Sequence, residues 1–318
     1  MSQFARRLDG IDKYAELSAG TGPPWWRDLL SLWRPSGVDA GEYGLRLAIR
    51  DNYLNFYRRG QSIALVNFNR EGVLTAKTHI KYVGKASLGR HDAKYVVMHD
   101  RRIFRGREEF ASYQGSDTLK KWIAVVDRDY AGDEKQLVDR LVTANPSVID
   151  LEMGLPSWGE QKTAPRMDLI AIELLGQAPQ VVFWEAKLVT DGRIRCRGDV
   201  VIDEKPEVLK QLVAYRKFLE EPGHAELVSK AYSNAARLMV RLRKIADGCS
   251  EKHSLGGEIL AAAAAPELVV DRKPRLVVFN QKNASQAAWV AHARRLQEAG
   301  ITMTVIEERG SFALGSPP

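Results

Sequence analysis

Hydrophobic and polar residues alternate through four short runs between residues 44 and 83. Polar or glycine-containing pairs at residues 51–52, 59–60 and 71–72 separate these runs. Alternation with a period of two is typical of a β-strand, and such pairs are typical of turns. The pattern therefore predicts a β-meander that buries one of its faces.

Six basic residues lie within these runs and would give the predicted meander a basic face. They are Arg46, Arg50, Arg58, Lys77, His79 and Lys81. A basic sheet face can bind phosphate groups, although a solvated face is the more frequent case. The sequence leaves both interpretations open.

Residues 25–33 read WWRDLLSLW and predict a short helix with an aromatic face. Tryptophan side chains can stack on nucleic-acid bases. Burial of tryptophan is, however, a common way to anchor a small element on a core. We therefore expect this helix to hold the N-terminal segment against the rest of the protein.

Residues 84–115 are polar and charged, and they predict connecting structure around one or two short elements. We place a domain boundary within residues 115–132. Residues 1–125 would then form a smaller β-rich N-terminal domain of unassigned role, and residues 126–318 a second domain.

Beyond this boundary the apolar spacing becomes that of a helix, which Pro146 ends. A strand follows directly, and residues 166–175 and 180–189 then predict a hairpin. The near-continuous apolar character of the hairpin indicates that both faces of its sheet are covered. Two helices, over residues 205–221 and 224–246, and a strand-helix-strand unit complete the chain. The predicted order is α-β-β-β-α-α-β-α-β, which belongs to the α/β class.

Composition adds a modest indication about partners. The 318 residues are 45% hydrophobic and 27% charged, as in an ordinary soluble globular protein. Lysine and arginine number 47 against 40 acidic residues, which gives a net charge of +7 and an isoelectric point near 9.3. This mild excess favours a polyanionic partner such as nucleic acid.

The sequence also indicates the compartment. The opening residues lack the apolar segment of a signal peptide, and the apolar run at residues 261–265 is far shorter than a membrane span. With Cys196 and Cys249 alone, neither a disulfide framework nor a zinc site is indicated. We therefore expect a cytoplasmic protein with no membrane partner.

Among the charged residues of the apolar hairpin strands are Asp168, Glu185 and Lys187. An unpaired carboxylate in a buried strand is costly unless a metal ion or hydrogen bonds compensate it. Glu185 and Lys187 are two residues apart, so both point to one face of the sheet while Ala186 points to the other. Two carboxylates with water and substrate oxygens suit Mg²⁺, which would polarise a phosphate and activate water. Lys187 would orient or deprotonate that water and stabilise charge in the transition state.

The segment MDLIAIE…VVFWEAK resembles the D…ExK signature of the PD-(D/E)xK nuclease superfamily, with Met167 in place of the signature's proline. Gln211 and Tyr215 lie one helical turn apart. They resemble the QxxxY motif of the branch that includes RecB-like and Cas4-like nuclease domains. The resemblance covers residues 133–307.

The resemblance implies a restriction-endonuclease-like α-β-β-β-α-β core, with a mixed central sheet flanked by helices. It also implies that an acidic residue of the first helix assists the metal, for which Glu134 is the best match and Glu152 its rival. The cysteine cluster of Cas4-like enzymes is absent from the sequence, so an iron–sulfur cluster is not implied. The residues that it implies for catalysis are Asp168, Glu185, Lys187, Gln211 and Tyr215.

Two further roles follow from the resemblance. The backbone carbonyl of Ala186 would be a metal ligand beside Asp168, Glu185 and Glu134. Gln211 and Tyr215 would position the substrate or Lys187.

Arginines alternate in the segment that follows Lys187. Arg193, Arg195 and Arg197 would face one way in an extended loop and form a phosphate clamp next to the site. A merely solvated loop is an equally good interpretation.

The function that the sequence predicts is a Mg²⁺-dependent nuclease, in which Mn²⁺ can replace Mg²⁺ and DNA is favoured over RNA as substrate. Restriction, repair and antiviral defence are the pathways considered. Two copies could pair to cut both strands, and a protein or ligand could activate the enzyme through the N-terminal domain. The alternative is a non-catalytic nucleic-acid-binding protein that retains a nuclease fold.

Overall fold

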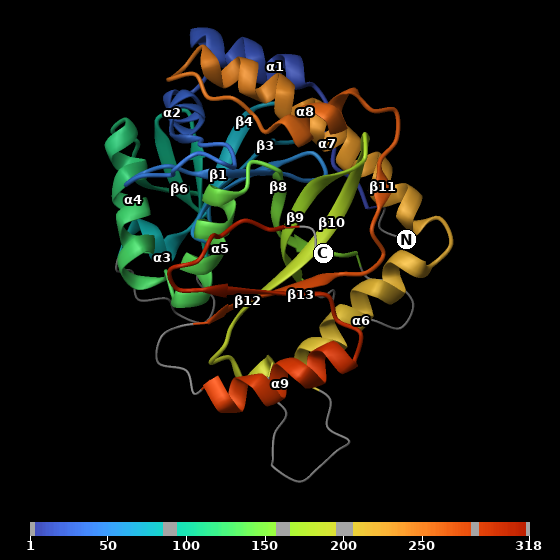
Figure 1. Cartoon of the computed structure of the whole chain (residues 1–318). Coiled ribbons are helices and arrows are strands. Elements are labelled where there is room, and N and C mark those ends of the chain that lie inside the picture. The colour runs from blue at the N-terminus through green and yellow to red at the C-terminus, as the bar shows by residue number, and fades with distance from the viewer. Residues whose placement is uncertain (1–3, 85–93, 157–165, 195–205, 281–285, 316–318) are drawn as a thin grey trace.

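The computed structural model describes residues 4–84, 94–156, 166–194, 206–280 and 286–315, which form a mixed α/β structure with two sheets (Figure 1). The first sheet is antiparallel, and its seven strands neighbour one another in chain order. The meander predicted over residues 44–83 is confirmed by the first four strands as far as His79, but residues 80–83 form a helix instead of the end of the fourth strand. The strands are β1 (Arg46–Ile49), β2 (Leu54–Arg58), β3 (Gln61–Phe68), β4 (Leu74–His79), β5 (Tyr95–His99), β6 (Arg102–Arg105) and β7 (Glu108–Ser112).

Strands β5 to β7 correct the prediction that residues 84–115 mainly connect other elements. Val96 and Met98 of β5 are buried and alternate with more exposed neighbours, whereas every residue of β1 and β2 is buried. β7 is short and lies at the edge of the sheet with mostly exposed side chains. Edge strands often carry charged residues. In the sequence these charges hide the alternation of apolar and polar residues.

Helices cover this first sheet. They are α1 (Ile11–Glu16), the π-helical turn η1 (Leu17–Thr21), α2 (Pro24–Leu32), α3 (Ile80–Val83) and α4 (Ser116–Asp129). Trp25 and Trp26 of α2 are completely buried, and the Trp26 indole donates a hydrogen bond to the Tyr14 carbonyl at 3.1 Å. The expectation that these tryptophans anchor the N-terminal segment is confirmed.

The second sheet has the order β13-β12-β10-β9-β8, with β11 beside β10. Its β8–β9 and β9–β10 pairs are antiparallel, whereas β10–β12 and β12–β13 are parallel. The predicted β9–β10 hairpin is confirmed. The strands are β8 (Val148–Gly154), β9 (Arg166–Leu175), β10 (Ala178–Leu188), β11 (Val269–Val270), β12 (Arg275–Asn280) and β13 (Met303–Glu307).

Helices lie on both faces of the second sheet, as its continuous apolar strands predicted. One face packs against α5 through Leu137 and Leu141, and the other packs against α6 through Leu212 and Tyr215. Parallel strands need crossover connections, which helices supply here. The elements are α5 (Asp133–Ala144), the 3₁₀ turn η2 (Gly192–Ile194), α6 (Glu207–Glu220), α7 (His224–Asp247), α8 (Gly257–Ala264) and α9 (Gln286–Glu298).

The sequence did not predict α1, α3, α4, α8 or β11. Helix α4 occupies residues that were expected to hold the domain boundary. Helix α8 reads GEILAAAA and lacks the regular polar face that reveals an amphipathic helix. Strand β11 has two residues, which is too short for a periodic pattern.

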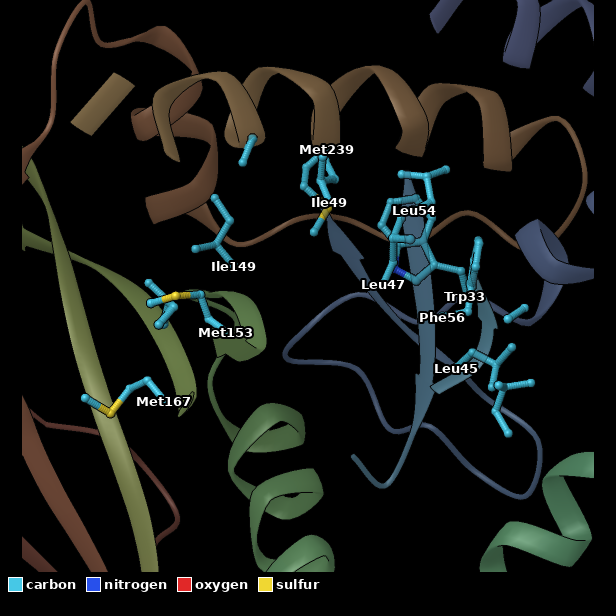
Figure 2. Packing of buried hydrophobic residues seen from close by; sticks show 14 of the residues in the cluster. Trp33, Leu45, Leu47, Ile49, Leu54, Phe56, Ile149, Met153, Met167 and Met239 are labelled. Atoms are coloured by element: carbon cyan, nitrogen blue, oxygen red, sulfur yellow. The ribbon is translucent and has the colours of Figure 1, made fainter. Parts of the chain in front are cut away.

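Two clusters of buried hydrophobic residues each contain side chains from both sheets. Figure 2 shows α7 above strands of both sheets, with Met239 close to Ile49 of β1 and with Ile149 of β8 nearby. The domain division at residues 125 and 126 falls inside α4, which packs on α3, β2 and β3 of the first sheet. Helix α4 therefore belongs with the first sheet.

Buried arginines also join the two halves of the chain. Arg46, Arg50 and Arg58 are almost inaccessible. Arg58 forms an ion pair with Asp127 of α4 at 2.5 Å, and Arg50 forms one with Asp150 of β8. These three side chains are neither a phosphate-binding face nor a solvated one. They hold the first sheet to its neighbours.

No helix within the described ranges is long and apolar enough to cross a membrane.

Candidate active site

Strands β9 and β10 bring the predicted acidic residues together. The register pairs Trp184 with Leu169, which places Asp168 beside Glu185 at the next position. The backbone N–H of Ala186 donates a hydrogen bond to Asp168 Oδ2 at 2.9 Å. Asp168 and Glu185, 8% and 1% exposed, therefore occupy one level of the sheet.

Lys187 completes this group on the same face of β10. Its ammonium group donates hydrogen bonds to Glu185 Oε1 at 2.5 Å and to the Ala186 carbonyl at 2.8 Å. It also lies 3.7 Å from Asp168 Oδ2. A cation that is 1% exposed is thus held between two carboxylates and a backbone carbonyl.

Glu134 joins the group from the first turn of α5. Its Oε2 atom lies 3.8 Å from Lys187 Nζ. Its rival Glu152 forms an ion pair with Lys135 instead. Of the two candidates, Glu134 is the one at the site.

Asp191 is a further acidic residue here that the sequence analysis missed. Arg193 bridges Asp191 and Glu134, at 2.5 Å and 2.8 Å. Burial opposes ionisation, but the Arg193 side chain and backbone N–H lower the pKa of Asp191 to about 2. The sequence feature that could have indicated Asp191 is the Asp-Gly pair at residues 191–192. This pair predicts a turn directly after the strand that bears the ExK motif.

The predicted arginine clamp is altered by this geometry. Arg193 lies in the 3₁₀ turn η2 and not in an extended segment, and it is ion-paired with protein carboxylates. Arg195 and Arg197 lie outside the described residues.

Gln211 and Tyr215 hold the strands that carry the site. The Gln211 amide donates a hydrogen bond to the Arg166 carbonyl at 2.6 Å. The buried Tyr215 hydroxyl donates one to the Met153 carbonyl at 2.8 Å. These bonds tie α6 to β8 and β9, next to Asp168.

The site carries more negative than positive groups. Its carboxylates are Glu134, Asp168, Glu185 and Asp191, and its cations are Lys187 and Arg193. If all of them are ionised, two negative charges are not compensated by other described residues of this group. The Glu185 Oε2 atom is buried and accepts no hydrogen bond within the described part of the chain.

This imbalance shifts the protonation of the site. Burial and the neighbouring Asp168 raise the pKa of Glu185 to about 8, although Lys187 opposes the shift. Burial lowers the pKa of Lys187, but Asp168, Glu185 and Glu134 together raise it above its ordinary value. Perturbed groups of this kind concentrate at functional sites.

The residues present fit a hard divalent cation. Across the described ranges, no three acidic, histidine or cysteine side chains form a ready metal cage. Mg²⁺ commonly uses only one or two carboxylates and takes its other ligands from water and substrate. Glu185 Oε2, which has no partner in the described part of the chain, and the adjacent Asp168 carboxylate offer those two groups, and the Ala186 carbonyl and Glu134 are further oxygen donors nearby.

Comparison of the chain with protein-family models, curated proteins and solved structures found no match. The interpretation of the site therefore depends on its geometry and on the motif resemblance.

Proposed function

We propose that this chain is a divalent-metal-dependent nuclease that hydrolyses phosphodiester bonds. The observation that carries the proposal is the convergence of Asp168, Glu185 and Lys187 on adjacent strands, with one buried Glu185 oxygen that has no partner among the described residues. The cost of burying such an oxygen is offset if a cation binds there. The element order from α5 to β12 also supports a restriction-endonuclease-like core.

In this proposal Asp168, Glu185 and the Ala186 carbonyl hold Mg²⁺ or Mn²⁺, with Glu134 nearby. The bound cation would polarise the phosphate and acidify the attacking water. Lys187 is already fixed by two hydrogen bonds and its ammonium form is favoured. We therefore assign Lys187 to orienting the water and stabilising charge on the phosphate, and not to abstracting the proton.

Gln211 and Tyr215 are positioning residues in this proposal. Their hydrogen bonds fix the backbone of β8 and β9, and so the level of Asp168 relative to Glu185. A small displacement of a metal-holding carboxylate lowers a rate strongly. The QxxxY motif would thus act on catalysis through the strands.

DNA is the favoured substrate, as the basic charge and the motif resemblance suggest. The pathway stays a prediction, with restriction, repair and antiviral defence as the possibilities. A cytoplasmic location and an endonucleolytic dimer are predictions as well. So is activation through the N-terminal part of the chain.

A non-catalytic nucleic-acid-binding protein is the second candidate. The ion pairs of the site favour this candidate. Lys187 pairs with Glu185, and Arg193 pairs with Glu134 and Asp191. In that case the cations would close the site and the fold would bind nucleic acid without cutting it.

The test incubates the full chain with supercoiled plasmid, linear DNA, single-stranded DNA and RNA, in Mg²⁺, in Mn²⁺ or in chelator. We expect metal-dependent cleavage, and we expect Lys187→Ala and Asp168→Asn to lower the rate by about 10²–10³-fold, the scale on which loss of one preorganised charge acts. Lys230→Ala, at an exposed lysine of α7, is the control and should cut like the wild type.

Two outcomes would count against the nuclease. Cleavage that Lys187→Ala and Asp168→Asn leave unchanged would assign the activity elsewhere. Binding of nucleic acid without cleavage in every metal condition would favour the second candidate.

A further inference from the structure

A separate pocket lies on the first sheet, among α3, β6, β7 and α4. Its volume is about 520 Å³, and Lys81, Tyr82, Val125 and Tyr130 are among its lining residues. Pockets for small ligands usually measure about 300–1,000 Å³. The pocket shares no residue with the group around Lys187.

Lys81 gives this pocket a cation without a carboxylate partner in the described part of the chain. Its ammonium group lies 4.2 Å from the Tyr130 ring centroid and 4.9 Å from that of Tyr82. Its hydrogen-bond partner is the neutral side chain of Gln61, whose Oε1 atom is 3.3 Å away. Burial lowers the pKa of Lys81, and no acidic neighbour contributes to the shift.

The remaining walls divide into an apolar part and a polar part. Val83, Ala111 and Val125 are half-buried and line the pocket with aliphatic surface. Lys121 is exposed at the same pocket and adds a second positive charge, and the ion-paired Arg128 and Asp129, 2.8 Å apart, line the pocket as well. Hydroxyl and amide groups come from Ser112, Gln114 and Thr118.

These features match the parts of one class of ligand. A phosphate group would pair with the Lys81 ammonium, which aromatic rings and one amide now surround. An apolar ring system would lie on the aliphatic wall. Hydroxyl and amide groups would satisfy polar edges of the ligand, as in other small-molecule sites.

We propose that this pocket binds a nucleoside monophosphate, with the phosphate at Lys81 and the base against the wall formed by Val83, Ala111 and Val125. The proposal does not depend on the nuclease assignment. It gives the first sheet a ligand-binding role of its own.

Isothermal titration of the full chain tests the proposal, with AMP, GMP, CMP and UMP as probes and with adenosine and inorganic phosphate as partial ligands. We expect saturable binding of at least one monophosphate, tighter than either partial ligand. Lys81→Met keeps the length of the side chain but removes its charge, and should weaken binding by about tenfold or more. Lys77→Met, at an exposed lysine of the same sheet, should bind like the wild type.

Ala111→Phe is the second variant, because it fills the pocket without changing charge, and it should also weaken binding. Absence of saturable binding by all four monophosphates would overturn the proposal. So would binding that a folded Lys81→Met or Ala111→Phe protein retains at full strength. Inorganic phosphate binding as tightly as the monophosphates would overturn the assignment of the base to the aliphatic wall.

Discussion

Two of the buried clusters of charge differ in how far their carboxylate oxygens are satisfied. One is centred on Asp150, where the two sheets meet. The other is centred on Glu185, at the β9–β10 hairpin. Asp150 and Glu185 themselves are both almost inaccessible, so the contrast between these two carboxylates lies in their partners and not in their burial.

The Asp150 cluster is complete. Asp150 Oδ1 accepts from Arg50 and from the Leu151 N–H, and Oδ2 accepts from Arg6 and from the Tyr232 hydroxyl. Burial alone would raise the pKa of Asp150, but Arg50 and Arg6 lower it below its ordinary value. This carboxylate is ionised and neutralised by the protein itself.

The Glu185 cluster is incomplete. Glu185 Oε2 has no hydrogen-bond partner in the described structure, and carboxylates outnumber cations around it. Its pKa is raised where that of Asp150 is lowered. A satisfied buried charge supports the fold, whereas the unsatisfied oxygen of Glu185 is the basis of our proposal that a cation binds there.

The largest effect is expected where the complete cluster is broken. Asp150→Ala leaves two buried arginines unpaired and should lower the free energy of unfolding by about 3–5 kcal/mol. Urea unfolding in chelator measures it. Asp12→Ala removes an exposed ion pair with Arg241 and should change stability by less than about 1 kcal/mol. Equal effects from both variants would contradict the structural role of Asp150.

A smaller effect is expected from Tyr215→Phe. The change removes the bond to the Met153 carbonyl and should cost about 1–3 kcal/mol, because that carbonyl loses a buried donor. Tyr95→Phe, at an exposed tyrosine, is the control. A Tyr215→Phe protein as stable as the wild type would remove the support role assigned to this residue.

The stability of the protein should depend on pH in opposite directions for the two clusters. Between its ordinary pKa of 4.5 and its folded value of about 8, Glu185 holds its proton more tightly in the folded protein. Its contribution to stability is therefore full below pH 4.5 and is lost as the pH rises through about 8, in metal-free buffer. Asp150, with a lowered pKa, contributes above its ordinary value of 3.8 and loses this contribution as the pH falls.

Glu185→Gln should flatten the alkaline part of this profile and should not destabilise the protein at pH 8. Urea unfolding across the pH range, in chelator, is the measurement. Glu207→Gln, at an exposed residue of α6, serves as the control and should keep the wild-type slope. A Glu185→Gln profile as steep as that of the wild type would show that another group titrates.

The smallest effect is expected from Arg193→Gln. Arg193 is 43% exposed, so loss of its ion pairs should change the free energy of unfolding by less than about 1 kcal/mol. Removing a competing cation should at the same time tighten the binding of Mn²⁺, measured by calorimetry. Weaker Mn²⁺ binding would mean that Arg193 organises the carboxylates and does not compete for them.

The central part of the site could be predicted from the sequence because its residues lie close together along the chain. Glu185 and Lys187 share a strand face by the period of two, and the short turn of the hairpin fixes Asp168 beside them. The apolar residues around these three positions indicated the two strands, β9 and β10. The meander and most of the helices followed from similar local patterns.

Contacts between distant segments could not be predicted. The Arg50–Asp150 pair joins residues 100 positions apart, so a basic strand face was expected where a buried ion pair exists. Arg193 likewise meets Glu134 across 59 positions. Local periodicity carries no information about such partners.

Calorimetric titration with Mn²⁺ at about pH 8.5, where Glu185 is largely ionised, tests the central claim most directly. The wild type should bind Mn²⁺ in a saturable manner, and so should the Asp12→Asn control. The Asp168→Asn/Glu185→Gln double variant should not bind it, although it remains folded by circular dichroism. Equal Mn²⁺ binding by the folded double variant and the wild type would contradict the account.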